Sequence, residues 1–338
     1  MPRVSVIVLN YNGINLIAAC LESLRTQSYC DFEVVVVDNA STDGSLELVR
    51  KEFSEARIIA LEKNLGFCVA NNLAITATES EYVALLNNDT EVDPGWLRAL
   101  VETLDSDPAA GFCASRMIRI SDRKSLDSAG DIFYSHGVAA KRGEGLPADS
   151  FSAADYVFGA CAGAAVYRRA LFDSIGLLDA EFGSMDEDVD LSFRAQLSLF
   201  KCRYVPAAIV YHHVGASFNR VPGWRILLAR RNIVTLLLKN MPGDILRRRS
   251  AQIFGYILAG DVKWILKGYG AAVVTARWEN MRSLRRVMLQ RREIQMNRKI
   301  SSRDLEGLFT PSPLTRPLRK LFWVLRSDKS HDARVSHQ

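Results

Sequence analysis

Carboxylates and amides gather at a few points of this 338-residue chain, and their types and spacing could do chemistry. Asp89 closes a run that begins at Tyr82, in which a short apolar segment stops abruptly at Asn87, Asn88 and Asp89. Open α/β sheets bind ligands beyond the carboxyl ends of their strands, so Asp89 is well placed to hold a divalent cation against a phosphate. The structural alternative is that these residues only cap the strand and begin a turn.

A second group of acids lies much later in the chain. Asp186, Glu187, Asp188 and Asp190 precede a helical pattern, where their charges repel one another unless a helix N-terminus or a cation compensates. Such surroundings can hold one carboxylate as a base near neutral pH, which the deprotonation of a hydroxyl requires. A solvated acidic helix start is the alternative, above all for Asp186 and Asp190.

Two adjacent histidines follow a third strand pattern, which begins at Val205 and runs into His212 and His213. Neighbouring side chains on a strand point to opposite faces, so only one of the pair can easily point inward. An imidazole nitrogen and a carboxylate oxygen together suit Mn²⁺, and Mg²⁺ is also a candidate.

The elements that must position these residues alternate between strands and helices in the first third of the chain. Apolar runs predict strands, and amphipathic spacing predicts helices between them. The predicted strands are Val4–Leu9, Phe32–Val37, Arg57–Leu61 and Tyr82–Leu86, and the predicted helices are Asn15–Gln27, Ser45–Phe53, Gly66–Thr78 and Pro94–Asp105. Repeated βα units imply an α/β fold with a parallel sheet covered by helices on both faces.

The turn after the first strand argues against two common nucleotide-binding classes. It reads Asn10-Tyr11-Asn12-Gly13 and lacks the GxGxxG pattern of a dinucleotide-binding fold, and the chain has no GxxxxGK[ST] motif. Amides and a carboxylate follow the predicted strands instead, and these groups suit a pyrimidine edge, ribose hydroxyls and a metal-bound diphosphate.

Four segments, taken in order, resemble the family 2 glycosyltransferases with the GT-A fold, a Rossmann-like, mostly parallel sheet flanked by helices. They are Val4–Asn12, Val37–Ser45, the cluster Asn64–Phe67 with Asn71 and Asn72, and Asn87–Asp89. The subgroup that the chain resembles is the rhamnosyltransferase-like enzymes of bacterial surface polysaccharide synthesis, over about residues 3 to 240. The resemblance implies a metal-dependent hexosyltransferase that transfers a sugar, with rhamnose as one candidate, from a UDP- or dTDP-sugar to an acceptor hydroxyl with inversion.

The resemblance also implies a role for individual residues. Asp188 falls at the general base and Glu187 at the acceptor site. Asp89 corresponds to the metal-binding acid of the acidic motif, in which Asn87 replaces the first acid. His212 corresponds to a second ligand of Mn²⁺ or Mg²⁺, with His213 as the alternative. The nucleotide-sugar donor is expected to contact Leu9, Asn10, Tyr11, Asn12, Asp38, Asn39, Asn64, Asn71 and Asn88.

The remaining third of the chain differs in character, because long amphipathic patterns with many arginines replace the βα units. We expect a catalytic domain over 1–221, an amphipathic helical region over 222–309 and a proline-containing basic tail over 310–338. Trp264, Tyr269 and Trp278 among basic residues suit a helix that lies in a membrane interface, where a lipid-linked or polysaccharide glycan acceptor would be met. The alternative is a helical appendage packed on the catalytic domain or on a second subunit of a homo-oligomer.

Composition narrows the setting further. The net charge is +5, but the basic residues are interleaved with apolar helical faces, so nucleic acid is not an expected partner. Six scattered cysteines without CxxC pairs and an N-terminus too short for a secretory signal favour a cytoplasmic location, peripheral on the inner face of the membrane. Two rival functions stay open: a metal-dependent nucleotidyltransferase, which lacks its glycine-rich, lysine-bearing loop here, and a non-catalytic sugar-binding protein, which leaves Asp188 and His212 without a role.

Overall fold

The computed structural model describes residues 1–215 and 222–312, so the predicted basic tail lies almost entirely outside the described residues. The strands are β1 (Val4–Asn10), β2 (Phe32–Asp38), β3 (Arg57–Ala60), β4 (Tyr82–Asn87), β5 (Thr90–Val92), β6 (Ala110–Arg119), β7 (Leu126–Ser128), β8 (Asp131–Tyr134), β9 (Val138–Lys141), β10 (Asp155–Val157), β11 (Ala164–Arg168) and β12 (Lys201–His212). The α-helices are α1 (Ile17–Arg25), α2 (Ser45–Glu52), α3 (Gly66–Thr76), α4 (Trp96–Ser106), α5 (Arg169–Ile175), α6 (Glu187–Leu197), α7 (Pro222–Asn240), α8 (Gly243–Trp264), α9 (Gly270–Met296) and α10 (Ser302–Gly307).

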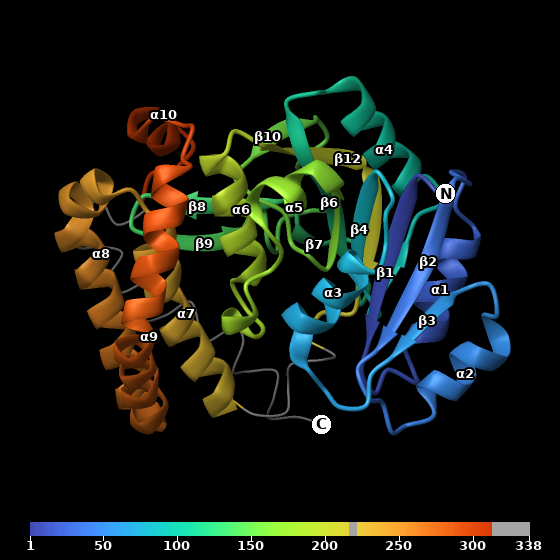
Figure 1. Cartoon of the computed structure of the whole chain (residues 1–338), viewed down its shortest axis with the longest axis horizontal. Helices are drawn as coiled ribbons and strands as arrows, with labels where there is room; N and C mark the ends of the chain where they lie inside the picture. The colour runs from blue at the N-terminus through green and yellow to red at the C-terminus, as the bar shows by residue number, and fades with distance from the viewer. Residues whose placement is uncertain (216–221, 313–338) are drawn as a thin grey trace.

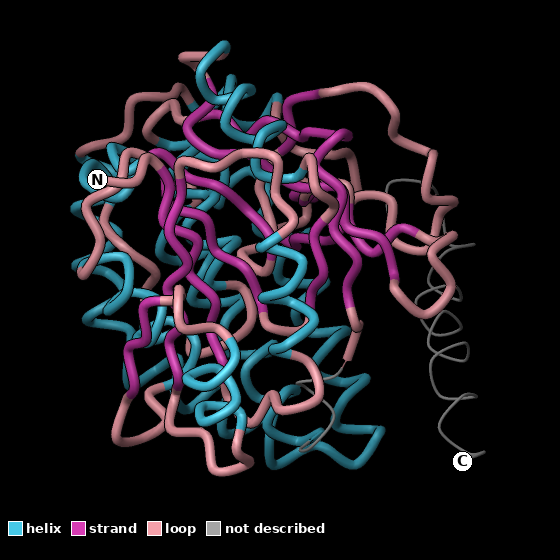
Figure 2. The backbone as a smooth tube through the Cα atoms, turned by 90° about the vertical axis from the view of Figure 1, so that its right-hand side faces the viewer, coloured by secondary structure: helices cyan, strands magenta, loops and turns pink. Residues whose placement is uncertain are grey.

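One large sheet forms the centre of the molecule, with its strands in the order β10-β12-β6-β11-β4-β1-β2-β3 (Figure 1). The pairs β1/β2, β1/β4, β2/β3 and β6/β12 are parallel, whereas β11 is antiparallel to both β4 and β6. Helices lie on either side of these strands, as the turned view shows (Figure 2). The α/β class and the mostly parallel sheet predicted from the sequence are therefore confirmed.

The sheet is buried on both faces, which explains the continuous apolar runs of its central strands. Helices α1, α2 and α4 cover one face and bury Ile17, Val49 and Trp96 against it. Helices α3, α5 and α6 cover the other face and bury Leu171 and Leu191 there. Because parallel strands end at the same edge, the loops after β1, β2 and β4 meet, and their polar side chains can form one site.

A group of short strands lies between β6 and β11 and was not predicted from the sequence. Strand β7 pairs with β6, and β8 and β9 form a separate hairpin. Each has only three or four residues, too few for an alternating pattern to stand out.

The C-terminal helices pack on the part of the chain that carries the large sheet, through an apolar cluster that includes Phe193, Leu236 and Met241. Helix α8 ends at a short π-helical turn, Ile265–Tyr269, in which Gly268 has a φ of 89° and so breaks the helix. Asp261 holds this end together, because its carboxylate accepts hydrogen bonds from Arg230 of α7 and Arg277 of α9. None of the helices in the described part of the chain is both long and apolar enough to cross a lipid bilayer.

Candidate functional site

A network of buried amides joins the carboxyl ends of β1, β2 and β4. Asn10 donates from Nδ2 to Asp38 Oδ1 at 3.0 Å, and its own Oδ1 accepts from Asn88 Nδ2 at 2.8 Å. Asp38 Oδ2 accepts from the backbone N–H of Ser41 at 3.0 Å. A Cβ on Gly13 would come within 2.4 Å of atoms of both Asn10 and Asn88, so the glycine permits this close packing. The network fixes the Asp38 carboxylate at the strand edge.

A second set of amides joins the loops after β2 and β3. Asn39 Nδ2 donates to Asn64 Oδ1 at 3.0 Å, and Asn39 Oδ1 accepts from the backbone N–H of Leu65 at 2.8 Å. Asn12 lies beside the first network, because its Oδ1 accepts from the backbone N–H of Thr42 at 2.8 Å. The structure therefore brings Asn12, Asn39 and Asn64 to the same sheet edge as Asp38.

The other three residues expected at the donor site differ in their surroundings. Tyr11 is 49% exposed at the rim, and Leu9 packs against the apolar core beside the sheet. Asn71 is buried, and its Nδ2 donates to the carbonyl of Phe67 one turn earlier in α3. Tyr11 is thus open to a ligand, whereas Leu9 packs on the core and Asn71 is buried within α3.

Asp89 and His212 meet because β12 pairs antiparallel with β5. His212 lies opposite Thr90 in this pairing, and the backbone N–H of His213 donates to the carbonyl of Asp89 at 2.9 Å. As a result, His212 Nε2 lies 3.5 Å from Asp89 Oδ1. The His213 side chain is instead 3.6 Å from Glu91 and 38% exposed.

Asp127 of β7 completes this group and was missed by the sequence analysis. The side chain is fully buried; Oδ2 lies 2.9 Å from His212 Nδ1, and both oxygens accept from Lys141 Nζ at 2.8 Å. Burial alone would raise the pKa of Asp127, but the hydrogen bond from His212 and the charge of Lys141 lower it to about 2. No local pattern marks this aspartate, since its partner is 85 residues away in sequence.

The two flanking carboxylates also act on His212. Burial by itself lowers the pKa of the imidazole, but hydrogen bonds to Asp127 and Asp89 outweigh burial and raise that pKa to about 9. In the metal-free protein the ring is therefore protonated at neutral pH. A metal ion on Nε2 would have to displace that proton.

Asp188 lies in the first turn of α6 and faces the segment before β11. Its Oδ2 accepts from the backbone N–H of Ala162 at 3.2 Å, and its Oδ1 accepts from that of Val189 at 2.8 Å. The preceding residues Met185 and Asp186 have φ values of 86° and 64°. Such left-handed backbone costs a non-glycine residue roughly 1–3 kcal/mol, and strain of this kind clusters at functional sites.

Three carboxylic acids lie within electrostatic reach of Asp188: Asp131 and Glu187 are buried, whereas Asp186, like Asp188 itself, is half-buried. Burial raises the pKa of Asp188, and burial together with the charge of Asp188 raises those of Asp131 and Glu187 well above their ordinary values. The same two causes raise the pKa of Asp186 to about 7. Glu187 is 8% exposed, and its Oε2 has no hydrogen-bond partner among the described residues. A raised pKa suits a carboxylate that must take up a proton near neutral pH.

Asp190, two residues further on, has a structural role. Its carboxylate is fully buried and accepts from Arg194 at 2.9 Å, Lys239 at 2.9 Å and Asn240 at 2.8 Å. These charges outweigh burial and lower the pKa of Asp190. The contacts attach α6 to α7 and leave Asp188 as the carboxylate of this turn that faces the β11 side.

Lys141 links the two halves of the site. It holds Asp127 directly, and its charge also lowers the pKa of Asp188, so the ammonium lies within electrostatic reach of both. The charge of Lys141 therefore acts on one carboxylate in each half of the candidate site.

The residues present fit a divalent cation that a substrate helps to bind. Asp89 and His212 offer one carboxylate and one imidazole, a donor set that suits Mn²⁺ and is compatible with Mg²⁺. Within 1–215 and 222–312, no three His, Cys, Asp or Glu side chains form a group that could hold a metal alone. Phosphate oxygens of a nucleoside diphosphate would supply the missing ligands, as is usual for such ions.

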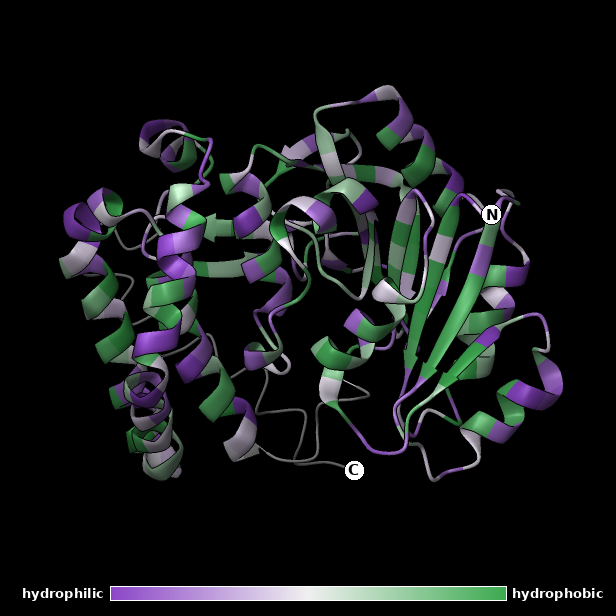
Figure 3. Cartoon of the chain, viewed as in Figure 1, coloured by the Kyte–Doolittle hydropathy of each residue, from purple (hydrophilic) through white to green (hydrophobic). Residues whose placement is uncertain are grey.

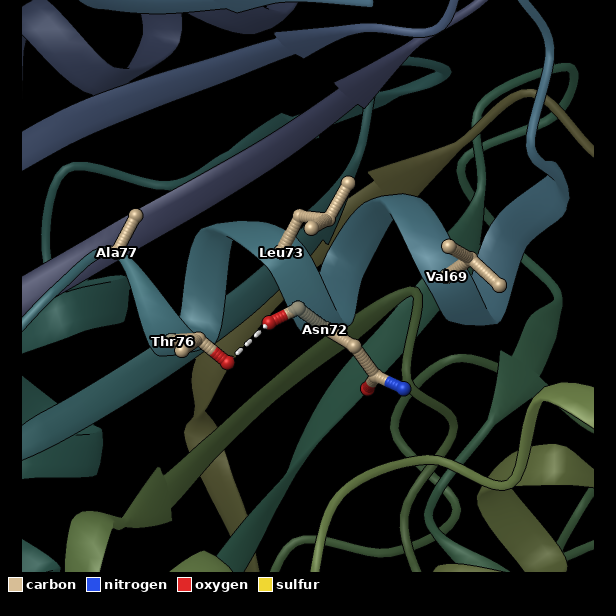
Figure 4. A pocket seen from close by; sticks show the side chains of 5 residues that line it. All are labelled: Val69, Asn72, Leu73, Thr76 and Ala77. Atoms are coloured by element: carbon tan, nitrogen blue, oxygen red, sulfur yellow. Dashed lines mark hydrogen bonds between the residues drawn. The ribbon is translucent and has the colours of Figure 1, made fainter.

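A hollow of about 310 Å³ lies elsewhere, along one side of α3 (Figure 4). It is lined by Val69, Asn72, Leu73, Thr76 and Ala77. Its two polar side chains are already bonded, because Thr76 donates to the carbonyl of Asn72 and the Asn72 amide pairs with the backbone of Leu178. The hollow contains no titratable group and is not part of the site.

The acid cluster predicts an unusual dependence of stability on pH. Because the folded-state pKa of Asp186 is about 7 against 3.8 for the free side chain, the folded protein keeps this proton while the unfolded chain loses it. The free energy of unfolding should therefore fall as pH rises from about 4 to 7. Asp186→Asn should raise it by about 1–3 kcal/mol at pH 8 and by less at pH 5, as measured by urea denaturation.

Asp190→Asn is the matched control for this prediction. The pKa of Asp190 is lowered, so the ionised form stabilises the fold and the substitution should destabilise the protein at pH 8. An equal effect of Asp186→Asn at both pH values would contradict the assignment of a strained, protonated Asp186.

Comparison with known proteins places these features in a family. The family model "Glycosyl transferase family 2" matches residues 5–176. N-acetylglucosaminyl-diphospho-decaprenol L-rhamnosyltransferase of Mycobacterium tuberculosis is 26% identical over 243 residues, which cover 64% of this chain and 78% of that protein. Succinoglycan biosynthesis protein ExoO of Rhizobium meliloti is 30% identical over 65% of this chain and 64% of that protein. Five curated relatives, 24% to 31% identical, are matched over only 18% to 64% of their own length.

Solved structures share the fold at low sequence identity. A mannosyltransferase from Pyrobaculum calidifontis in complex with GDP-Man and Mn²⁺ superposes with a TM-score of 0.53 at 19% identity, over 87% of this chain and 85% of that one. GalNAc-T7 with UDP, GalNAc and Mn²⁺ gives a TM-score of 0.56 at 14% identity, over 79% and 57%. The predicted GT-A fold is thereby confirmed, and with the family model covering half of its length the chain belongs to glycosyl transferase family 2.

Proposed function

We propose that the protein is an inverting, metal-dependent hexosyltransferase. Its donor would be a UDP- or dTDP-sugar, with rhamnose as one candidate sugar, and its acceptor a hydroxyl of a lipid-linked or polysaccharide glycan. The family and the rhamnosyltransferase relative support this proposal, as do the polar strand edge around Asp38, the Asp89–His212 pair and the raised pKa of Asp188.

The donor would lie along the edge formed by β1, β2 and β4. Asp38 and Asn39 would bind the base or ribose, with Asn10 and Asn88 holding Asp38 in place through their hydrogen bonds. Tyr11 and Asn12 would border the nucleoside, since Tyr11 is half exposed at the rim. Leu9, Asn64 and Asn71 would complete the wall. Amides and a carboxylate satisfy the donors and acceptors of a pyrimidine and a ribose.

Asp89 and His212 would hold Mn²⁺ or Mg²⁺ together with the diphosphate. When bound, the cation would neutralise the charge that develops on the departing nucleoside diphosphate. His212 Nε2 already lies 3.5 Å from Asp89, so a small adjustment lets both bind one ion.

Asp188 would remove the proton from the acceptor hydroxyl as the hydroxyl attacks the anomeric carbon. Burial raises its pKa, and the hydrogen bonds from the backbone N–H groups of Ala162 and Val189, with the charge of Lys141, oppose that rise. Glu187, buried beside it, would orient the acceptor. Attack from the face opposite the leaving diphosphate inverts the anomeric configuration, and no covalent sugar intermediate forms.

One observation supports this proposal above the others: the pairing of β12 with β5 brings His212 Nε2 within 3.5 Å of Asp89 Oδ1, directly after Asn88, which belongs to the Asp38 network. The test is a screen of nucleotide sugars with Mn²⁺ and with Mg²⁺, in which release of the nucleoside diphosphate is measured. We expect release from at least one UDP- or dTDP-sugar, and none after EDTA treatment. Activity that EDTA leaves unchanged would contradict the metal dependence.

We also propose that helices α8 and α9 contact the membrane surface from the cytoplasmic side. The exposed side chains of these helices include Phe254, Leu258, Trp278 and Met281, and Leu266 in the turn between them is 82% exposed. Hydrophobic and hydrophilic segments alternate along both helices (Figure 3), and the turn between them lies on the same side as the tips of β1 and β2 (Figure 1). Helices of this kind lie in the interface rather than span it.

The basic residues near this surface favour an anionic lipid as its partner. Lys263 and Lys267 lie 5.5 Å and 5.2 Å from the Trp264 ring, and Arg282 and Arg285 are exposed on α9. Each basic residue near an anionic membrane contributes roughly 1 kcal/mol. A lipid-linked acceptor would then meet the site from this side.

Sedimentation with anionic vesicles tests the membrane proposal. The full chain should sediment with vesicles that contain phosphatidylglycerol, and the combined variant Leu266→Ser and Trp278→Ser should lose most of this binding because exposed apolar area is removed. Leu199→Ser is the matched control, since Leu199 is 51% exposed but lies on the catalytic domain. Equal sedimentation of all three proteins would contradict the membrane proposal. Concentration-dependent dimerisation that the double variant abolishes would contradict it too, because the exposed side chains would then bind a second subunit.

A further inference from the structure

Asp127 occupies a position that the proposed reaction does not yet explain. It lies in β7, outside every motif singled out in the sequence, and its side chain is fully buried. A buried carboxylate is costly unless charged or polar partners compensate it. Both of its partners, His212 and Lys141, belong to the candidate site.

A β-bulge at Asp127 determines the direction of its side chain. Met117 and Ile118 are neighbours on β6, but their partners on β7 are Ser128 and Leu126, so Asp127 is the extra residue of a β-bulge. Bulges re-aim side chains and are frequent next to active sites. On its other side β6 pairs with β12, with Ile118 opposite Tyr211, so the bulge lies across β6 from the end of β12 that carries His212.

The hydrogen bond to His212 determines which ring nitrogen is available. With Nδ1 only 2.9 Å from Asp127 Oδ2, the proton that remains after metal binding would stay on Nδ1. Nε2, 3.5 Å from Asp89, would then carry the lone pair that faces the cation. Lys141 neutralises the Asp127 carboxylate from its other side, with Nζ 2.8 Å from both oxygens.

We infer that Asp127 is a positioning residue for the metal site. The β7 bulge places its carboxylate against His212 Nδ1, and this hydrogen bond holds the imidazole ring with Nε2 directed at the cation. This inference rests on the proposed function, because it requires Asp89 and His212 to bind a metal. Partners of this kind orient a ligating histidine, and their loss typically weakens metal affinity about 10- to 100-fold.

The test is the affinity of the full-length protein for Mn²⁺ in the presence of UDP or dTDP, measured by electron paramagnetic resonance of the free aqueous ion, with the nucleotide and Mn²⁺ without protein as the blank. Asp127→Asn should weaken binding about 10- to 100-fold and reduce the electron spin-echo modulation from imidazole nitrogen. Asp190→Asn is the matched control, because Asp190 is an equally buried carboxylate with lysine and arginine partners. Its Mn²⁺ affinity should stay within about twofold of wild type, since it contacts no ligand of the site.

Each outcome separates this inference from the proposed function. If Asp127→Asn binds Mn²⁺ like wild type while His212→Ala does not, the metal pair stands and the role of Asp127 is refuted. If the wild-type protein does not bind Mn²⁺ even with the nucleoside diphosphate present, the proposed metal site fails and the inference fails with it.

A measurement on the wild-type protein covers the case in which Asp127→Asn does not fold. In protein labelled with ¹⁵N-histidine and loaded with Zn²⁺ as a diamagnetic substitute, His212 should carry its proton on Nδ1 and its metal on Nε2. The opposite tautomer, or a ring that does not respond to Zn²⁺, would overturn the inference.

Discussion

Asp188→Asn should abolish sugar transfer without unfolding the protein. The amide cannot accept the acceptor's proton, and loss of a general base typically costs about 10²- to 10⁴-fold in kcat. Its carbonyl oxygen can still accept from the backbone N–H of Ala162, which lies 3.2 Å from the carboxylate in the wild-type protein. The KM for the donor should therefore change little. Steady-state release of nucleoside diphosphate, with Tm as the measure of folding, checks both statements.

Asp186→Asn is the matched control for this prediction. It removes one carboxylate from the same acidic cluster, two residues earlier, and should retain transfer. Turnover like that of wild type in purified Asp188→Asn would refute the assignment of Asp188 as the base.

Asp89→Ala should have an effect of similar size, by a different route. It removes one of the two side chains that we propose as metal ligands, and the several kcal/mol that a cation contributes to transition-state stabilisation correspond to about 10²-fold or more in rate. Mn²⁺ affinity should fall together with kcat. Calorimetric titration with Mn²⁺ and the transfer assay measure the two quantities separately.

His213→Ala separates this prediction from a general disturbance of the strand end. His213 lies next to His212 but faces Glu91, 3.6 Å away, so its removal should leave Mn²⁺ affinity nearly unchanged. Loss of Mn²⁺ binding in His213→Ala with retention in His212→Ala would show that the other histidine is the ligand.

The first four βα units were predictable because their strands are buried on both faces. Continuous apolar runs such as Val4–Asn10 and helical spacing such as Ile17, Cys20, Leu21 and Leu24 follow directly from that burial. The short strands after Ala110 were not predicted, since β7 to β10 contain only three or four residues each. Strands β7 and β10 are placed by pairing with β6 and β12, and β8 and β9 by pairing with each other, and no local pattern encodes these pairings.

Only part of the candidate site could be predicted from the sequence, because the rest depends on strand pairings and tertiary contacts. Asp89 stood out because it ends an apolar strand, whereas Asp127 reaches His212 only through a bulge and a pairing across the sheet. The two acids Asp188 and Asp190 look alike in sequence. Only the tertiary contacts of Asp190 with Lys239 and Asn240 distinguish a structural carboxylate from one that faces the site.

The acid cluster links function to stability. Asp131, Asp186, Glu187 and Asp188 all have raised pKa values, so ionising them opposes folding. The proposed site, which needs a base poised near neutral pH, would tolerate this cost. We therefore expect that, among substitutions of these acids by amides, those nearest to Asp188 raise the free energy of unfolding most.

The most direct test of the proposed reaction is the anomeric configuration of the product. With the donor that the screen identifies, Mn²⁺ and a soluble acceptor analogue, ¹H NMR of the first product should show the configuration opposite to that of the donor sugar, with nucleoside diphosphate released in equal amount. A product with the donor's own configuration would contradict direct attack by a hydroxyl that Asp188 deprotonates, and with it the central claim.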